Sequence, residues 1–204
     1  SLQSRILDSG SRVLLTVNGF HRGNKFVEMK SVVDKALVGC PSVTDVIVLR
    51  RETDNIVNVM KEGRDVWWED TIAKAPEQCE PVVMNAEDPL FILYTSGSTG
   101  KPKALLHTTA GYLTYAAYTF KTMFEYKEGD VYFITADVGW ITGHSCGIYG
   151  PLINGATTVW MEGIPTFPTN SRLWSVINDH KVNQFYTAPT LLRMLKRLGD
   201  EHVK

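Results

Sequence analysis

The sequence predicts an α/β fold with largely parallel sheets flanked by helices. Short apolar runs recur along the chain, and Val46-Ile47-Val48-Leu49 is typical of a strand that is buried on both faces. Segments of helical composition alternate with these runs. This alternation favours parallel strands joined by crossover helices.

The strands are expected at the apolar runs. The run at 90–94 is expected to be a buried strand, as is the run at 45–50. The full set of expected strands is 13–17, 45–50, 90–94, 131–135, 156–161 and 184–187.

The helices are expected between these strands. Ser31 is a suitable N-cap for a first helix that ends at Gly39 and Pro41. The stretch 51–87 is polar and weakly patterned, apart from a helical turn expected at Val66-Trp67-Trp68. Three further helices are expected at 107–124, 173–181 and 190–198.

Composition excludes several classes of function. Among 204 residues, 21 are basic and 22 acidic, which gives no bulk attraction to nucleic acid or to an anionic membrane. No apolar run reaches the roughly 20 residues of a membrane-spanning helix. Three cysteines are too few for a disulfide framework and favour an intracellular, reducing compartment, either cytosol or mitochondrion. The chain opens on Ser-Leu-Gln without Met, so we expect the natural N-terminus to be missing.

The segment 95–103, Thr-Ser-Gly-Ser-Thr-Gly-Lys-Pro-Lys, has the composition of a phosphate-binding loop. Its hydroxyls can donate hydrogen bonds to phosphate oxygens, its glycines let backbone N–H groups approach an anion, and its lysines add positive charge. The helix expected after it would direct its positive end at the same site. It is not a Walker A loop, because only two residues separate Gly97 from Gly100 and Pro102 stands where Walker A has Ser or Thr.

This segment resembles the signature loop of the adenylate-forming superfamily. Several longer segments resemble the AMP-forming acetyl-CoA synthetases within it, and the resemblance extends over the whole chain, weakest between 51 and 83. The segments are 85–94, 107–112, 136–145, 149–152 and 185–190.

The resemblance implies a chemistry and a set of ligands. Such enzymes activate acetate with ATP to acetyl-adenylate and pyrophosphate, and then transfer the acetyl group to CoA with release of AMP. The implied partners are the small molecules ATP, acetate and CoA, with Mg²⁺ accompanying ATP through a ligand outside this chain. Neither nucleic acid nor a membrane is implied.

The resemblance also assigns roles to residues. Lys101 is the implied catalytic residue. The ATP phosphates would be bound by Thr95, Ser96, Gly97, Ser98, Thr99, Gly100, Lys101 and Lys103; the acyl group by Trp140, Ile141, Thr142 and Gly143; and CoA by Arg22, Lys25, Thr142, Thr166 and Ala188.

Four positions depart from the family pattern. Lys25 replaces the usual Arg, which keeps the charge and loses bidentate geometry. Thr166 stands where Asn is frequent, and Ala104 where the loop normally continues with Gly. Cys146 replaces a residue that is commonly bulky.

The resemblance divides the chain at residue 83. Residues 1–83 would form an N-terminal lobe segment with the basic CoA-side residues, and 84–204 an AMP-binding core segment with the phosphate loop. Later family motifs and the C-terminal domain with its lysine would follow Lys204. We therefore expect the chain to be a fragment that is inactive alone.

Two alternatives remain open. A ligase for propionate or another short acid is one, because the tryptophan that limits acyl length in the family lies beyond Lys204. The other is a serine hydrolase, because Gly143-His144-Ser145-Cys146-Gly147 matches the Gly-x-Ser-x-Gly nucleophile elbow. The elbow needs a strand before the serine and a helix after it, and 148–151 is a poor helix sequence. No Cys or His spacing indicates a metal site.

Overall fold

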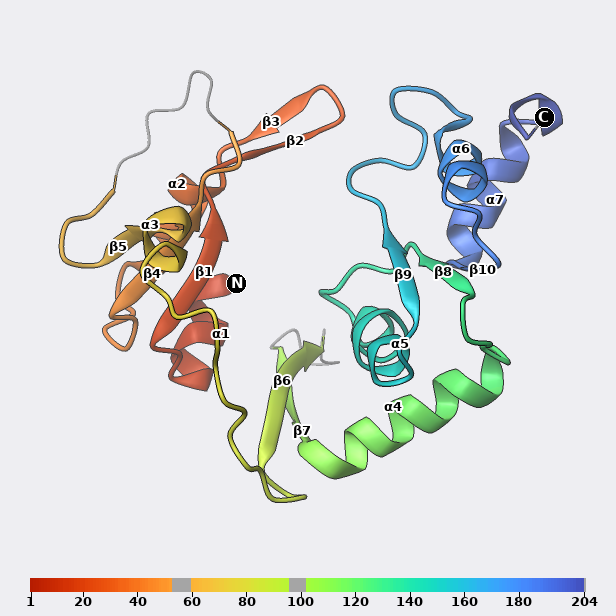
Figure 1. Cartoon of the computed structure of the whole chain (residues 1–204). Coiled ribbons are helices and arrows are strands. Elements are labelled where there is room, and N and C mark those ends of the chain that lie inside the picture. The colour runs from red at the N-terminus through yellow and green to blue at the C-terminus, as the bar shows by residue number, and fades with distance from the viewer. Residues whose placement is uncertain (53–59, 96–101, 204) are drawn as a thin grey trace. The chain divides into compact units, whose positions relative to one another are not determined.

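The computed structural model describes residues 1–52, 60–95 and 102–203, and the chain forms two compact units (Figure 1). Of the described residues, the first unit comprises 1–52, 60–82 and Pro102. The second comprises Val83–Thr95 and Lys103–Lys204. Each unit has its own parallel sheet, which confirms the α/β class.

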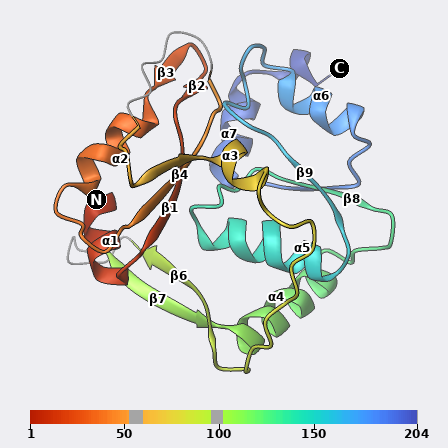
Figure 2. The same ribbon diagram turned by 60° about the vertical axis from the view of Figure 1, so that its left-hand side comes forward.

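The first unit is built on a three-stranded parallel sheet in the order β1-β4-β5. Its strands are β1 (Val13–Val17), β4 (Asp45–Leu49) and β5 (Asp65–Trp67), and its helices are α1 (Leu2–Ser9), α2 (Met29–Leu37) and α3 (Trp68–Ile72). An antiparallel hairpin of β2 (Phe20–Arg22) and β3 (Lys25–Val27) connects β1 to α2. Figure 2 shows α1 and α2 on one side of β1 and β4. Their apolar faces bury one core cluster, namely Ile6, Val33, Leu37, Cys40, Val43, Val46 and Val48.

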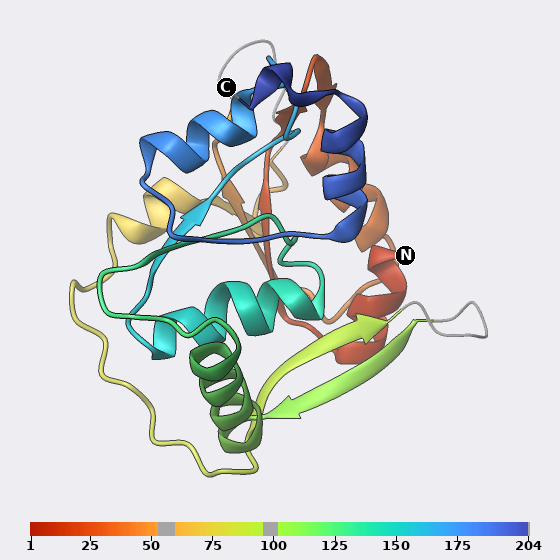
Figure 3. The ribbon, with the colours of Figure 1, turned by 90° about the vertical axis from the view of Figure 1, so that its right-hand side faces the viewer.

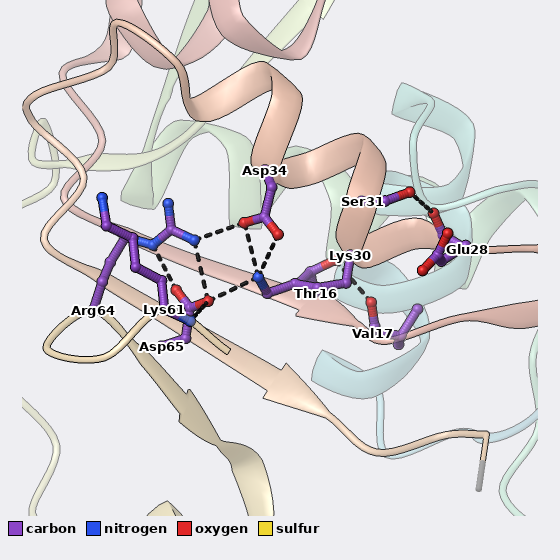
Figure 4. A network of polar contacts seen from close by, with 9 residues as sticks. All are labelled: Thr16, Val17, Glu28, Lys30, Ser31, Asp34, Lys61, Arg64 and Asp65. Atoms are coloured by element: carbon purple, nitrogen blue, oxygen red, sulfur yellow. Dashed lines mark hydrogen bonds and ion pairs between the residues drawn. The ribbon is translucent and has the colours of Figure 1, made fainter. Parts of the chain in front are cut away.

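A buried ion network ties α2 to β5 beside this core (Figure 4). The Lys30 ammonium lies 2.7 Å from a carboxylate oxygen of Asp34 and 2.7 Å from one of Asp65. Arg64 pairs with the same two carboxylates. The Lys30 and Asp65 side chains are 4% and 0% exposed, and each buried charge therefore faces an opposite one, as buried charges require.

The second unit has a parallel sheet in the order β10-β8-β9. Its strands are β8 (Val131–Ile134), β9 (Thr157–Trp160) and β10 (Gln184–Tyr186). An antiparallel hairpin of β6 (Pro89–Thr95) and β7 (Lys103–Thr108) leads into α4 (Thr109–Met123) (Figure 3). The remaining helices are the π-helix η1 (Gly143–Tyr149), α5 (Gly150–Ile153), α6 (Arg172–Asp179), α7 (Pro189–Arg197) and the 3₁₀-helix η2 (Asp200–His202).

The central strand β8 is buried on both faces. Tyr132 and Ile134 pack with Phe120 of α4 in one cluster, whereas Phe133 packs with Leu173 of α6 and Leu195 of α7 in another. Side chains alternate along a strand, so consecutive apolar residues serve the two cores. The expectation of buried parallel strands is thus confirmed here.

The region around the predicted phosphate loop differs from the expectation. The helix expected at 107–124 begins at Thr109, and β7 precedes it. Strand β7 pairs antiparallel with β6, and Ile92 is exposed, so the run at 90–94 is one strand of a hairpin rather than a strand buried in a parallel sheet. The loop is therefore followed by a strand rather than by the expected helix.

Three smaller expectations differ from the structure in whole or in part. Helix α2 begins at Met29 with Glu28 at its N-cap, and Ser31 instead donates a hydrogen bond to the Glu28 carbonyl from within the first turn. In β4 only one face is buried, because Val46 and Val48 are covered while Leu49 is exposed. The helical turn expected around 66–68 is present as α3, which begins at Trp68, whereas Val66 and Trp67 belong to β5.

Candidate functional site

A cavity of about 380 Å³ lies at the carboxyl edge of the second unit's sheet. Parallel strands bring their carboxyl ends to one edge, where α/β folds usually bind ligands. The cavity is lined by Thr135, Ala136, Asp137, Trp140, Thr142, Tyr186, Thr187, Ala188 and Pro189. Thr135 follows β8 and Thr187 follows β10, and their hydroxyls are hydrogen-bonded at 2.5 Å.

The cavity brings together three residues that the sequence predicted as site residues. Trp140, Thr142 and Ala188 all line it, although Ala188 is 46 positions after Thr142 in the sequence. Ala188 is the N-cap of α7, and this helix presents its amino end to the cavity. An indole, a hydroxyl and a helix amino end suit a small ligand with an apolar part and a polar or anionic part.

The other two predicted acyl-pocket residues lie around the same turn. Ile141 lines a separate hollow of about 290 Å³, whose wall it shares with Thr142. Gly143 is buried, and a Cβ atom there would lie 2.2 Å from the carbonyl oxygen of Asp137. Only glycine therefore permits this close approach of two backbone segments.

The turn before Trp140 is held by Asp137. Its carboxylate accepts a hydrogen bond from the Gly139 N–H at 2.6 Å, and its carbonyl accepts one from the Trp140 N–H at 3.1 Å. This aspartate also lines the cavity. Sequence reasoning gave no role to Asp137, Thr135 or Thr187, although their positions just after strand ends could have identified them.

The π-helix η1 continues from this turn and carries Ser145. The Ser145 hydroxyl is hydrogen-bonded to the Tyr112 hydroxyl of α4 at 2.7 Å. Burial is the main cause that raises the pKa of Tyr112, so its hydroxyl stays protonated near neutral pH. Ser145 is the third residue of a helix, not the tip of a strand-to-helix turn, and this geometry does not favour the hydrolase alternative. The expectation of a poor helix at 148–151 was wrong, because η1 runs into α5 there.

Aromatic rings connect the hairpin to η1. Phe91 of β6 lies 4.7 Å from the ring of His107, 4.8 Å from that of Tyr112 and 4.8 Å from that of His144. The Tyr149 ring completes the cluster at 5.6 Å from Phe91. Stacked and edge-to-face rings at such distances attract one another. Strand β6, which leads into the predicted phosphate loop, is thereby packed against the helix that follows Trp140 and Thr142.

The ends of the predicted phosphate loop face each other across the hairpin. Thr95 and Lys103 are register partners, and the Thr95 hydroxyl donates a hydrogen bond to the Lys103 carbonyl at 3.4 Å. The part of the loop at 96–101, which includes Lys101, lies outside the described residues. These members are Ser96, Gly97, Ser98, Thr99, Gly100 and Lys101.

The predicted CoA-binding residues lie at three places. Arg22 and Lys25 are register partners in the first unit's hairpin, where both are exposed. Thr166 is half-buried in the loop between β9 and α6 and does not line the cavity. Thr142 and Ala188 both line the cavity, so within the second unit the structure brings these two predicted CoA residues together.

The described residues contain no group of three or more potential metal-ligating side chains. All three cysteines are free thiols. Within the same described ranges, no helix is both long and apolar enough for a membrane span.

A family model described as "AMP-binding enzyme" matches residues 1–204. The chain belongs to this family. Its relatives include the acetyl-coenzyme A synthetase of Nostoc linckia, which is 53% identical over all of this chain and 60% of its own length. The acetyl-coenzyme A synthetase 2 of Pseudomonas aeruginosa is 54% identical over all of this chain and 31% of its own length. The chain therefore spans only part of the curated relatives it matches.

A solved structure supports the fold. Acetoacetyl-CoA synthetase from Streptomyces lividans matches 98% of this chain and 30% of its own chain, with a TM-score of 0.82 and 24% sequence identity. This likeness shows that the chain shares the fold of part of that synthetase.

Proposed function

We propose that this chain is part of an acetate–CoA ligase of the AMP-forming type. The observation that carries the proposal is the 52–54% identity, along essentially the whole chain, to proteins named acetyl-coenzyme A synthetase. The cavity at the sheet edge adds support, because it gathers Trp140, Thr142 and Ala188 at one place.

The proposed reaction has two steps. An acetate oxygen attacks the α-phosphorus of ATP, the bond to the β-phosphate oxygen breaks, and pyrophosphate leaves. The sulfur of CoA then attacks the acetyl-adenylate carbonyl, and AMP leaves as the thiol proton is lost. ATP enters as its magnesium complex, so Mg²⁺ is a component of the substrate, and the described residues contain no ligand set for it.

The residues divide between these steps. The segment 95–103 would hold the β- and γ-phosphates, and Lys101 would stabilise the charge that develops on departing pyrophosphate. Trp140 and Thr142 would enclose the acetyl group, where water exclusion protects the adenylate from hydrolysis. Arg22 and Lys25 would bind the CoA phosphates, and Thr166 and Ala188 would also contact CoA. An intracellular compartment, in keeping with the three free thiols, is part of the proposal.

A chimera tests the function. In it, this chain replaces the matching residues of the Pseudomonas aeruginosa synthetase, which supplies the remainder of the enzyme. We expect the chimera to form acetyl-CoA and AMP in equal amounts from acetate, ATP and CoA. A folded chimera that forms neither product would contradict the proposal, and a strong preference for propionate would favour the ligase for longer acids.

A further inference from the structure

The loop between β9 and α6 is held from within by one side chain. The Arg172 guanidinium donates hydrogen bonds to the carbonyls of Glu162 at 2.7 Å, Phe167 at 2.8 Å and Ile164 at 3.3 Å. The planar fork of an arginine suits several acceptors at once, and charge-assisted bonds of this kind are among the stronger ones. Residues 162–167 are therefore folded around Arg172.

The anchor of this arrangement is rigid. Arg172 is the first residue of α6, and the next residue, Leu173, is fully buried in the core cluster with Phe133 and Leu195. The loop adds one contact of its own, because the Phe167 N–H donates to the Ile164 carbonyl at 3.1 Å. Gly163 adopts a φ of +88°, and a Cβ atom there would come within 3.4 Å of the guanidinium. The backbone thus follows the side chain closely.

The location of the loop connects it to the site. Strands β8, β9 and β10 are parallel, so the loop that follows β9 emerges at the same sheet edge as Thr135 and Thr187. The loop does not line the cavity at that edge. A residue of the loop can therefore meet only a ligand that extends beyond the cavity, and Thr166 lies inside the segment that Arg172 holds.

We infer that Arg172 is a positioning residue for CoA binding. Arg172 fixes the backbone of residues 162–167 on both sides of Thr166. It thereby sets the orientation in which Thr166 would contact CoA, the second substrate. This inference rests on the proposed function, since CoA is the large substrate of its second step. Acetate is small enough for the cavity and does not depend on the loop.

Two variants test the inference in the chimera described above. We expect Arg172→Gln to raise the KM for CoA about tenfold, and to leave acetate-dependent ATP–pyrophosphate exchange, which needs no CoA, within about twofold. Arg172→Lys retains the charge without the fork and should give a smaller rise. The matched control is Arg197→Gln, at the far end of α7, which should change neither value.

Hydrogen exchange on the 204-residue chain provides a second measurement. The Phe167 amide should lose protection in Arg172→Gln and keep it in Arg197→Gln. An unchanged KM for CoA in an exchange-competent variant would overturn the inference, as would an equal loss of both half-reactions. Absence of pyrophosphate exchange in the folded chimera with the unchanged chain would instead overturn the proposed function.

Discussion

The hydroxyls of Thr135 and Thr187 are hydrogen-bonded across the carboxyl ends of two neighbouring parallel strands. Both residues line the cavity, so this bond fixes two sides of the site to each other. Replacing Thr187 with Val keeps the shape and leaves the Thr135 hydroxyl without this partner. We expect a loss of about 1 kcal/mol in the free energy of unfolding, measured with urea. The double variant Thr135→Val/Thr187→Val should lose less than the sum of the single losses, and strict additivity would contradict the coupling.

Acid should destabilise the first unit through Asp65. Burial disfavours its charged form, but hydrogen bonds from Arg64, Lys30 and the Lys61 backbone outweigh this and lower the pKa of Asp65 to about 2. A carboxylate whose folded pKa is depressed stabilises the fold above its unfolded pKa near 3.8, and that stability is lost as pH falls toward 2.

We expect Asp65 to account for a loss of about 2 kcal/mol across that window. Urea unfolding at a series of pH values measures it. In Asp65→Asn the acid-dependent loss should be smaller, and stability near neutral pH should fall by about 3 kcal/mol because the buried Lys30 ammonium loses one of its two carboxylate partners. Glu62→Gln, at an exposed carboxylate, should retain the full dependence.

Asn18 should stabilise the first unit at the point where the hairpin of β2 and β3 begins. This fully buried side chain donates to the Glu52 carbonyl at 2.7 Å, and its oxygen accepts from the backbone N–H groups of Gly19, Arg51 and Glu52. Asn18→Ala leaves these groups unsatisfied, and we expect a loss of about 3 kcal/mol in the free energy of unfolding. The exposed hairpin residue Asn24 provides the control, since Asn24→Ala should change stability by less than about 0.5 kcal/mol.

Lys101 should act on adenylation more than on acetate binding. In the chimera we expect Lys101→Ala to slow acetate-dependent ATP–pyrophosphate exchange by about 10²-fold, because the role proposed for this lysine is to neutralise the charge that develops as pyrophosphate leaves. The KM for acetate should change much less. Lys121→Ala, at an exposed position of α4, should have little effect. An unchanged rate of ATP–pyrophosphate exchange in Lys101→Ala would contradict the proposed role of Lys101 in adenylation.

Ser145 should not behave as a nucleophile. Its hydroxyl is hydrogen-bonded to Tyr112, and it lies within a helix instead of at a strand-to-helix turn. We therefore expect no covalent labelling of the chain by a fluorophosphonate probe, as judged by intact mass. Labelling that disappears in Ser145→Ala would revive the hydrolase alternative.

The parallel strands could be predicted from sequence because their burial is local and repetitive. Tyr132, Phe133 and Ile134 are consecutive and apolar, as a strand between two cores requires. The hairpin of β6 and β7 could not be predicted in this way, because the run at 90–94 is as apolar as a buried parallel strand. The partner strand β7 begins at Lys103, inside the loop motif. It ends at His107 and Thr108, directly before α4, so the sequence pattern assigns these two residues to the helix.

The candidate site was predictable only where its residues match the family resemblance, most directly where they also lie close together in the sequence. Trp140 and Thr142 are two positions apart, and the family resemblance assigns both to one acyl pocket. Asp137 and Arg172 act through backbone hydrogen bonds, which depend on how the chain turns and leave no periodic pattern in the sequence. The Lys30–Asp65 pair was also missed, since the partners are 35 residues apart and each alone is typical of a surface.

We propose that this chain supports the adenylation of acetate. The most direct measurement is ATP–pyrophosphate exchange by the chimera, with acetate present or omitted. We expect exchange that requires acetate, at a rate within about tenfold of that of the Pseudomonas aeruginosa synthetase. A folded chimera whose exchange is absent, or is the same without acetate, would contradict it.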